Sequence, residues 1–133
     1  MGATNVLIVE DEPDIAELLV FLMTHQGCRT KHAPNGLIAL QHLADDLPDL
    51  VETDMAMPVM DGSFLIETMR ASSRLRKVPI LVLSSMSEGT VRDICGAPFI
   101  YLQKPFRVAQ LSDSVETLLA GKSLIAVNPI PLN

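Results

Sequence analysis

The sequence predicts an α/β fold, with a doubly wound, five-stranded parallel sheet and helices on both faces. Strand patterns and helical patterns alternate five times along the chain, which is typical of strand–helix–strand units in a parallel sheet. Two of the strands are apolar throughout, as expected of strands that helices cover on both sides. The 133 residues suit one domain. The predicted strands are residues 6–9, 28–33, 49–54, 78–83 and 99–102.

The strands differ in polarity, and this difference predicts their places in the sheet. The runs VLIV at 6–9 and VPILVL at 78–83 are the two clearly buried strands. The second strand carries Arg29, Lys31 and His32, so we expect it at an edge of the sheet. Because crossovers between parallel strands are right-handed, few arrangements of the five strands then remain.

Start and stop signals delimit the helices. Pro13 suits a first helical turn, Gly27 ends that helix, and Asn35 can cap the next one. The pattern around Gly89 is a poor helix, and Gly121 is expected to end the last helix. The apolar residues at helical spacing that we expect to face the core are Ile15, Leu18, Leu19, Leu22, Met23, Ala39, Leu40, Leu43, Leu65, Ile66, Met69, Val108, Leu111, Val115, Leu118 and Leu119.

Composition excludes several classes of function. The net charge of −6 argues against nucleic-acid binding by this segment, which would favour a basic face. Cys28 and Cys95 lie far apart, in no metal-ligand or redox spacing, so we expect reduced thiols in a cytoplasmic protein. The chain shows no signal-peptide pattern and no apolar run long enough to span a membrane. These features predict a soluble, cytoplasmic domain.

Polar residues follow four of the strands at the point where each one ends. Glu10 and Asp11 follow the first strand, Asp54 ends the third, Ser84 follows the fourth and Lys104 follows the fifth. Carboxyl ends of parallel strands meet at one edge of a sheet, where open α/β sheets bind their ligands. We therefore expect all five side chains on one rim.

The chemistry of this rim predicts phosphoryl transfer. Close charges near a protein surface interact by roughly 4 kcal/mol, so three acids need a cation or a proton between them. Mg²⁺ prefers carboxylates, carbonyls and retained waters. A carboxylate such as that of Asp54 can act as a nucleophile toward phosphorus. Lys104 can pair with phosphoryl oxygens and Ser84 can donate a hydrogen bond to one, which is the positioning that phosphoryl transfer requires.

Four segments together resemble the receiver domain of two-component response regulators. They are VLIVEDE, DMAMPVMDG, the strand that ends in Ser84 and Ser85, and YLQKPF, and the resemblance covers residues 5–120. It implies the flavodoxin-like strand order 2-1-3-4-5 and a receiver domain over residues 1–121. It also implies a phosphoprotein of a signalling relay rather than an enzyme, which a histidine kinase or histidine phosphotransfer protein phosphorylates.

The resemblance implies roles for the acids. Asp54 matches the phosphoacceptor, and Asp11 and Asp54 match the Mg²⁺ ligands, with Glu10 assisting through water. The backbone carbonyl of Ala56 is implied as a further ligand. Glu10 stands where many members of the family have aspartate, a variant that the family tolerates.

The resemblance also implies a switch. Ser84 matches the hydroxyl that follows the phosphoryl group, and Lys104 matches its ion-pair partner. Tyr101 matches the aromatic residue that turns inward when the hydroxyl moves, although a plain core aromatic is an equal alternative. Pro105 would follow a cis peptide bond, as in the family. Phosphorylation would then change the face formed by the fourth helix, the fifth strand and the fifth helix.

Two departures from the family pattern, and two apolar positions beside the phosphoryl site, carry consequences. Glu52 lies inside the phosphoacceptor strand, where an apolar residue is usual, and a buried carboxylate is costly unless it is paired or protonated. The chain between Ser84 and Tyr101 is shorter than in the usual receiver, which predicts an unusual signalling face. The output partner therefore cannot be inferred from a close relative. Ala56 and Met86, two positions after Asp54 and Ser84, are apolar and cannot orient an attacking water, which predicts slow autodephosphorylation.

Alternatives stay open at this point. A pseudo-receiver would keep the fold as an interaction module without using phosphate. A flavodoxin-like enzyme or a phosphatase with an aspartyl intermediate is a third class. A haloacid-dehalogenase phosphatase carries a second aspartate two residues after its nucleophile, where this chain has Ala56. The tail 122–133 is either the start of a linker or an apolar segment that docks on the domain, and dimerisation is undecided.

Overall fold

The computed structural model describes residues 3–57, 59–96 and 99–123. Its five strands form one parallel sheet in the order β2-β1-β3-β4-β5, which confirms the predicted order. The strands are β1 (Asn5–Val9), β2 (Arg29–Ala33), β3 (Leu50–Thr53), β4 (Ile80–Ser84) and β5 (Ile100–Gln103). The helices are α1 (Pro13–His25), α2 (Gly36–Asp45), α3 (Gly62–Ala71), α4 (Glu88–Cys95) and α5 (Val108–Ser123).

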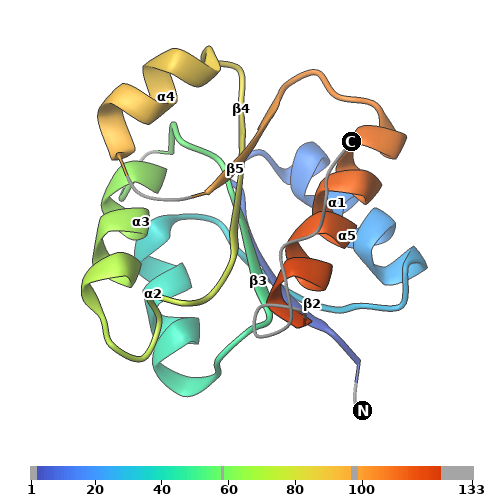
Figure 1. Ribbon diagram of the computed structural model, residues 1–133, viewed down its shortest axis with the longest axis horizontal. Helices are drawn as coiled ribbons and strands as arrows, with labels where there is room; N and C mark the ends of the chain where they lie inside the picture. The colour runs from blue at the N-terminus through green and yellow to red at the C-terminus, as the bar shows by residue number, and fades with distance from the viewer. Residues whose placement is uncertain (1–2, 58, 97–98, 124–133) are drawn as a thin grey trace.

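Helices cover the sheet on both faces (Figure 1), with α1 and α5 on one side and α2, α3 and α4 on the other. Successive residues of a strand point to opposite faces. Leu7 therefore joins the core under α2 to α4, while Ile8 joins the core under α1 and α5. The polar strand β2 lies at an edge of the sheet, as its composition predicts.

Side-chain caps begin three of the helices. The predicted cap Asn35 accepts the N–H of Ile38 through its side chain. Asp61 accepts the N–H of Phe64 at the start of α3, and Ser87 accepts the N–H of Thr90 at the start of α4. These bonds satisfy N–H groups that the first turn leaves without a partner. The weak pattern around Gly89 thus forms a helix with a capped start.

Three expectations about the helices are wrong. Leu18 is 46% exposed and Val108 is 55% exposed, so neither lies in the core. In α1 the buried stripe consists of Ala16, Leu19 and Met23, and Leu18 lies off this line. The helix α5 continues past Gly121 to Ser123, because a glycine costs a helix only about 1 kcal/mol relative to alanine. The two interpretations of the tail concern residues that mostly lie outside the described part.

The described part of the chain contains no helix with the length and apolar character that crossing a bilayer requires.

Candidate functional site

Three carboxylates meet at the carboxyl ends of two neighbouring strands. Strand β1 leads directly into Glu10 and Asp11, and Asp54 follows the adjacent strand β3. One carboxylate oxygen from each residue lies within 4.8 Å of the other two. Glu10 is buried, whereas Asp11 and Asp54 are partly exposed. The structure thus brings together the three acids that the sequence analysis places on one rim.

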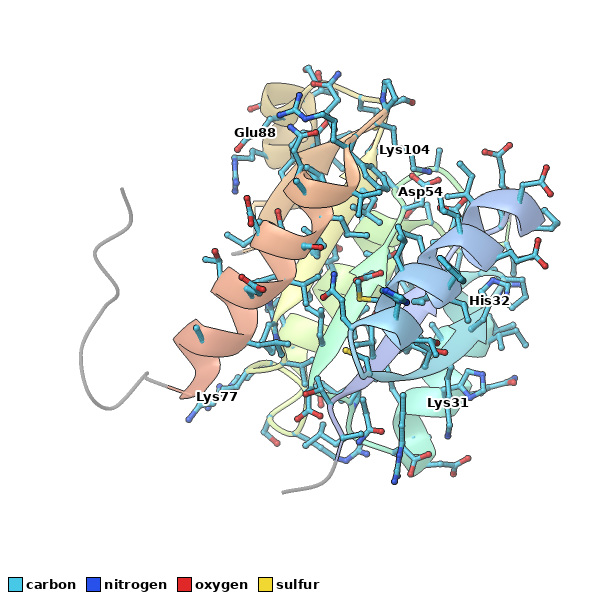
Figure 2. All side chains as sticks on the ribbon, turned by 90° about the vertical axis from the view of Figure 1, so that its right-hand side faces the viewer. Lys31, His32, Asp54, Lys77, Glu88 and Lys104 are labelled. Atoms are coloured by element: carbon cyan, nitrogen blue, oxygen red, sulfur yellow. The ribbon has the colours of Figure 1, made fainter. Side chains whose placement is uncertain are left out.

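Lys104 completes this group. Its Nζ donates to Oε1 of Glu10 at 3.1 Å and to Oδ2 of Asp54 at 3.4 Å. Figure 2 shows Asp54 and Lys104 side by side at one end of the sheet, with Lys31 and Lys77 toward the other end. The backbone N–H of Lys104 donates to the carbonyl of Ser84 at 2.8 Å. The peptide between Lys104 and Pro105 is cis, as the resemblance implied.

The electrostatics of the group follow from burial and from an excess of acids. Burial raises the pKa of Glu10, and the neighbouring Lys104 offsets this only in part. For Lys104, burial lowers the pKa, but the carboxylates of Asp54 and Glu10 together outweigh it and raise the pKa above its usual value. One ammonium therefore pairs with two of the three carboxylates, and a divalent cation would balance the remaining negative charge. Oxygen donors of this kind fit Mg²⁺.

The Asp54 carboxylate is held by its own loop. The N–H of Met55 donates to Oδ1 of Asp54 at 2.7 Å, so each carboxylate oxygen has a different donor. The hydroxyl of Thr53 donates to the backbone carbonyl of Asp54 at 2.8 Å, and the N–H of Gly62 donates to the carbonyl of Met55 at 2.8 Å. These bonds fix the turn that presents Asp54 at the rim.

Ser84, the last residue of β4, and Tyr101 of β5 both form hydrogen bonds with the backbone around the end of β4. The buried Ser84 hydroxyl accepts the N–H of Met86 at 3.1 Å. The Tyr101 hydroxyl donates to the backbone carbonyls of Ser84 and Met86. Burial raises the pKa of Tyr101, and nearby Glu88 adds to this effect. The two predicted switch residues therefore contact one segment of backbone, through which movement of one can affect the other.

Glu52 is the departure with the clearest structural consequence. It is fully buried in β3, and neither of its carboxylate oxygens has a hydrogen-bond partner among the described residues. On neighbouring strands it lies opposite Ile8 and Leu81, which belong to the apolar core under α1 and α5. Burial raises the pKa of Glu52 to about 8. At neutral pH the side chain is therefore mostly protonated in the folded domain.

His32 lies near the acids, although the sequence marks it only as a polar residue of an edge strand. It shares no ligand spacing with the other histidines. In the structure its Nε2 lies 2.8 Å from the backbone carbonyl oxygen of Glu10. A side-chain-to-backbone contact across 22 positions has no sequence signal, because it depends on the register between β1 and β2.

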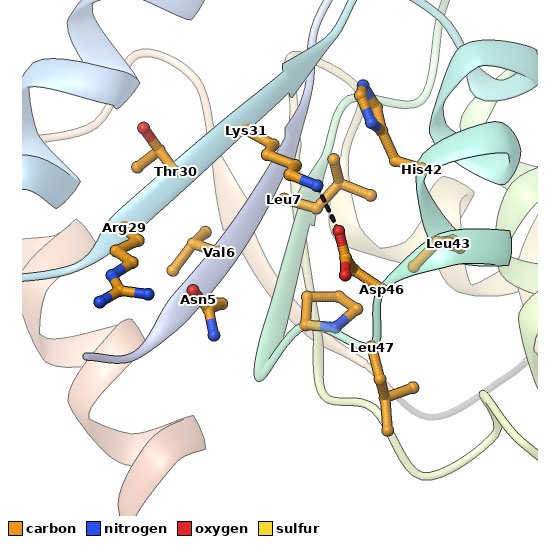
Figure 3. Close-up of a pocket in the computed structure, with 11 residues that line it drawn as sticks. Asn5, Val6, Leu7, Arg29, Thr30, Lys31, His42, Leu43, Asp46 and Leu47 are labelled. Carbon is orange, nitrogen blue, oxygen red and sulfur yellow. Dashed lines mark hydrogen bonds and ion pairs between the residues drawn. The ribbon is translucent and has the colours of Figure 1, made fainter. Parts of the chain in front are cut away.

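The larger of the two hollows described lies away from the acids. It has a volume of about 410 Å³ and lies between the start of β1, the edge strand β2 and the end of α2 (Figure 3). Lys31 and Asp46 form an ion pair across it, and this bond lowers the pKa of Asp46. Exposed pairs of this kind contribute little to stability. The volume of this hollow therefore does not mark it as the candidate site, because none of the three acids lines it.

Comparison with known proteins agrees with this geometry. A family model for the response regulator receiver domain matches residues 6–116, so the chain belongs to the family of response regulator receiver domains. The strand order, the acids and the lysine are the features that this chain shares with the expected pattern of the family.

The chain is also similar to individual relatives and solved structures. It is 36% identical over 126 residues to the regulatory protein AtoC of Escherichia coli, covering 93% of this chain and 27% of AtoC. The signal receiver domain of a signal transduction histidine kinase from Syntrophus aciditrophicus has a TM-score of 0.85 and 33% identity, with 98% of this chain and 100% of that chain covered. The receiver domain of sensor histidine kinase PA1611 from Pseudomonas aeruginosa, solved with a magnesium ion in its active-site cleft, has a TM-score of 0.82 and 25% identity, covering 90% and 99%.

Proposed function

We propose that Asp54 accepts a phosphoryl group from a histidine kinase or a histidine phosphotransfer protein, with Mg²⁺ bound by Asp11 and Asp54 and assisted through water by Glu10. The observation that carries this proposal is the convergence of three carboxylates within 4.8 Å, two of which share Nζ of Lys104. The magnesium ion in the active-site cleft of the PA1611 receiver domain supports the metal assignment. The backbone carbonyl of Ala56 is proposed as a further ligand.

The transfer is a single displacement at phosphorus. A carboxylate oxygen of Asp54 forms a bond to phosphorus while the bond from phosphorus to the donor imidazole nitrogen breaks. Lys104, which now pairs with Oδ2 of Asp54, can pair with the phosphoryl oxygens as they arrive. Bound Mg²⁺ supplies the positive charge that offsets those oxygens. The N–H of Met55 keeps the carboxylate oriented throughout.

The signal then passes through the loop after β4. The phosphoryl group adds about −2 charge and new acceptor oxygens, which stabilise a conformer in which the Ser84 hydroxyl donates to one of them. In that conformer Ser84 would give up its bond from the Met86 N–H. Tyr101, whose hydroxyl bonds to the same backbone, would move with the loop. The face made by α4, β5 and α5 would change and would bind an output domain or partner differently.

Acetyl phosphate tests the proposal directly. The intact domain, incubated with Mg²⁺ and acetyl phosphate and then weighed by mass spectrometry, is expected to gain the mass of one phosphoryl group. The Asp54→Asn variant and a sample with a metal chelator are expected to gain none. An unmodified wild-type mass would contradict the proposal and favour a pseudo-receiver. Modification that persists in Asp54→Asn would place the phosphoacceptor elsewhere.

Loss of phosphate from Asp54 is expected to be slow. Ala56 is exposed and Met86 is half-buried, and neither side chain can orient an attacking water. The double substitution Ala56→Asn and Met86→Glu is expected to speed the loss about tenfold, the effect of one hydrogen bond that lowers the barrier by about 1.4 kcal/mol. The measurement is the decay of phosphorylated protein after acetyl phosphate is removed.

The control for this rate is Ser85→Glu, which adds the same charge at the exposed neighbour of Met86. We expect its decay to match that of the wild type. If the double variant decays no faster, or if Ser85→Glu accelerates the decay equally, orientation of water at positions 56 and 86 does not control the rate.

A further inference from the structure

We propose that His32 is a positioning residue for the metal site, a role that rests on the proposed function. Its imidazole lies 2.8 Å from the backbone carbonyl oxygen of Glu10. A carbonyl oxygen only accepts hydrogen bonds, so the ring nitrogen Nε2 must carry the proton and donate it. The donor comes from the edge strand β2, and the acceptor lies directly after β1. The contact thus links the edge of the sheet to the acids.

This bond replaces a backbone bond that the sheet loses at the same point. The N–H of Glu10 donates to the carbonyl of Ala33 at 3.0 Å, so the parallel ladder reaches Glu10. If the ladder continued, the carbonyl of Glu10 would accept the N–H of Asn35. Strand β2 ends at Ala33, however, and Asn35 is the cap of α2. The side chain of His32 supplies the missing donor, as expected for a backbone acceptor that cannot be left without a partner.

The bond orients the peptide that joins the two acids. The carbonyl of Glu10 and the N–H of Asp11 belong to the same planar peptide unit, so holding the carbonyl fixes the direction in which the chain enters Asp11. The N–H of Glu10 is fixed by Ala33, and its side chain is fixed by Lys104. With His32 in place, residues of β2 bind both the N–H and the carbonyl of Glu10. The Glu10 carboxylate and the backbone that carries Asp11 are then oriented before a cation arrives.

Orientation before binding is the reason to expect an effect on affinity rather than on folding. His32 is an exposed residue of an edge strand, and substitutions at such positions usually change stability little. Groups that orient metal ligands, by contrast, typically change metal affinity when they are removed. The measurable signature is therefore weaker Mg²⁺ binding by a domain that stays folded.

The test compares two substitutions that differ only in the donor. His32→Gln keeps an N–H at similar reach, whereas His32→Met has a similar shape and no donor. We expect Mg²⁺ affinity, measured from the amide resonance of Asp11 in an NMR titration, to fall about tenfold in His32→Met and to recover largely in His32→Gln. Phosphorylation of His32→Met by acetyl phosphate should need correspondingly more Mg²⁺. Its rate should therefore lie closer to that of the wild type at saturating Mg²⁺ than at limiting Mg²⁺. His42→Met, in the hollow at the other end of the sheet, is the matched control.

The outcomes separate this inference from the proposed function. Wild-type affinity in His32→Met would overturn the role of His32, as would a His32→Gln variant that is as weak as His32→Met. A fall in affinity that His42→Met shares would overturn it too. If the wild type binds Mg²⁺ but takes no phosphate, the proposed function fails, and the Mg²⁺ titration still decides the role of His32.

Discussion

The free energy of unfolding of the Glu52→Leu variant is expected to exceed that of the wild type by about 3 kcal/mol near pH 7. The wild-type side chain is fully buried in an apolar core without a hydrogen-bond partner among the described residues, and its pKa rises from 4.5 to about 8 on folding. Each unit of such a rise corresponds to about 1.4 kcal/mol. Leucine has a similar volume and no polar atoms, so it fills the site at no such cost.

The pH dependence has a definite sign. A carboxyl group whose pKa is raised by folding does not destabilise the folded state as long as the group is protonated in both states. For Glu52 this is the case below pH 4.5. As the pH rises toward about 8, the unfolded chain ionises at Glu52 while the folded domain does not, and stability falls. The raised pKa of Glu10 contributes with the same sign. Only the difference between wild type and variant isolates Glu52.

Urea denaturation between about pH 5 and about pH 8 measures this difference. Glu52→Gln removes the charge but keeps a buried polar group, so we expect it to lose the part of the pH dependence that Glu52 contributes and to remain less stable than Glu52→Leu. Glu116→Gln, at an exposed position of α5, should unfold within about 0.5 kcal/mol of the wild type. Parallel pH profiles for the wild type and Glu52→Gln would show that Glu52 does not titrate in this range.

Much of this fold follows from local patterns. Each strand and helix is recognised from its own residues, and their alternation predicts the parallel sheet. The charges of Arg29 and Lys31 likewise predict from one strand alone that β2 lies at an edge. The set of Glu10, Asp11, Asp54 and Lys104 is predicted by the same logic. Parallel strands end at one rim, so position along each strand determines which side chains meet.

The wrong or missed features depend on relations between elements. Leu18 fits the helical spacing of α1 as well as Leu19 does, and only the orientation of α1 on the sheet decides that Leu18 is exposed. His32 acquires a role because β2 ends at Ala33 while the chain beyond β1 continues. The sequence marks Glu52 as unusual, but the absence of a partner among the described residues becomes visible only once the surrounding core is assembled.

Gly62→Ala is expected to destabilise the domain by about 3 kcal/mol, at the upper end of the usual cost of overpacking. A Cβ at this position would lie 2.2 Å from the carbonyl oxygen of Asp54 and 3.0 Å from Cα of Met55. Both atoms belong to backbone that cannot rotate away. The bond from the Gly62 N–H to the Met55 carbonyl holds the two segments in this close approach.

Alanine substitutions at two other glycines provide a comparison, because a Cβ would meet less crowding there. Gly89 lies in α4 with nothing within 4 Å of a built Cβ, so Gly89→Ala should stabilise the domain by about 0.5 to 1 kcal/mol. At Gly36 a Cβ would meet Cγ of Met60 at 2.8 Å, which can rotate away, and the backbone oxygen and Cβ of Met60 at 2.8 Å and 3.0 Å, which cannot. We expect Gly36→Ala to fall between the other two in urea denaturation.

The same substitution links stability to chemistry. Relief of the clash at Gly62 is expected to move the carbonyl of Asp54, and this movement would displace the Asp54 carboxylate from Lys104. Gly62→Ala should therefore take up phosphate from acetyl phosphate more slowly even at temperatures where it is fully folded, whereas Gly89→Ala should match the wild type. Equal rates for all three proteins, with only the unfolding transition shifted, would show that the clash is relieved away from the loop that carries Asp54.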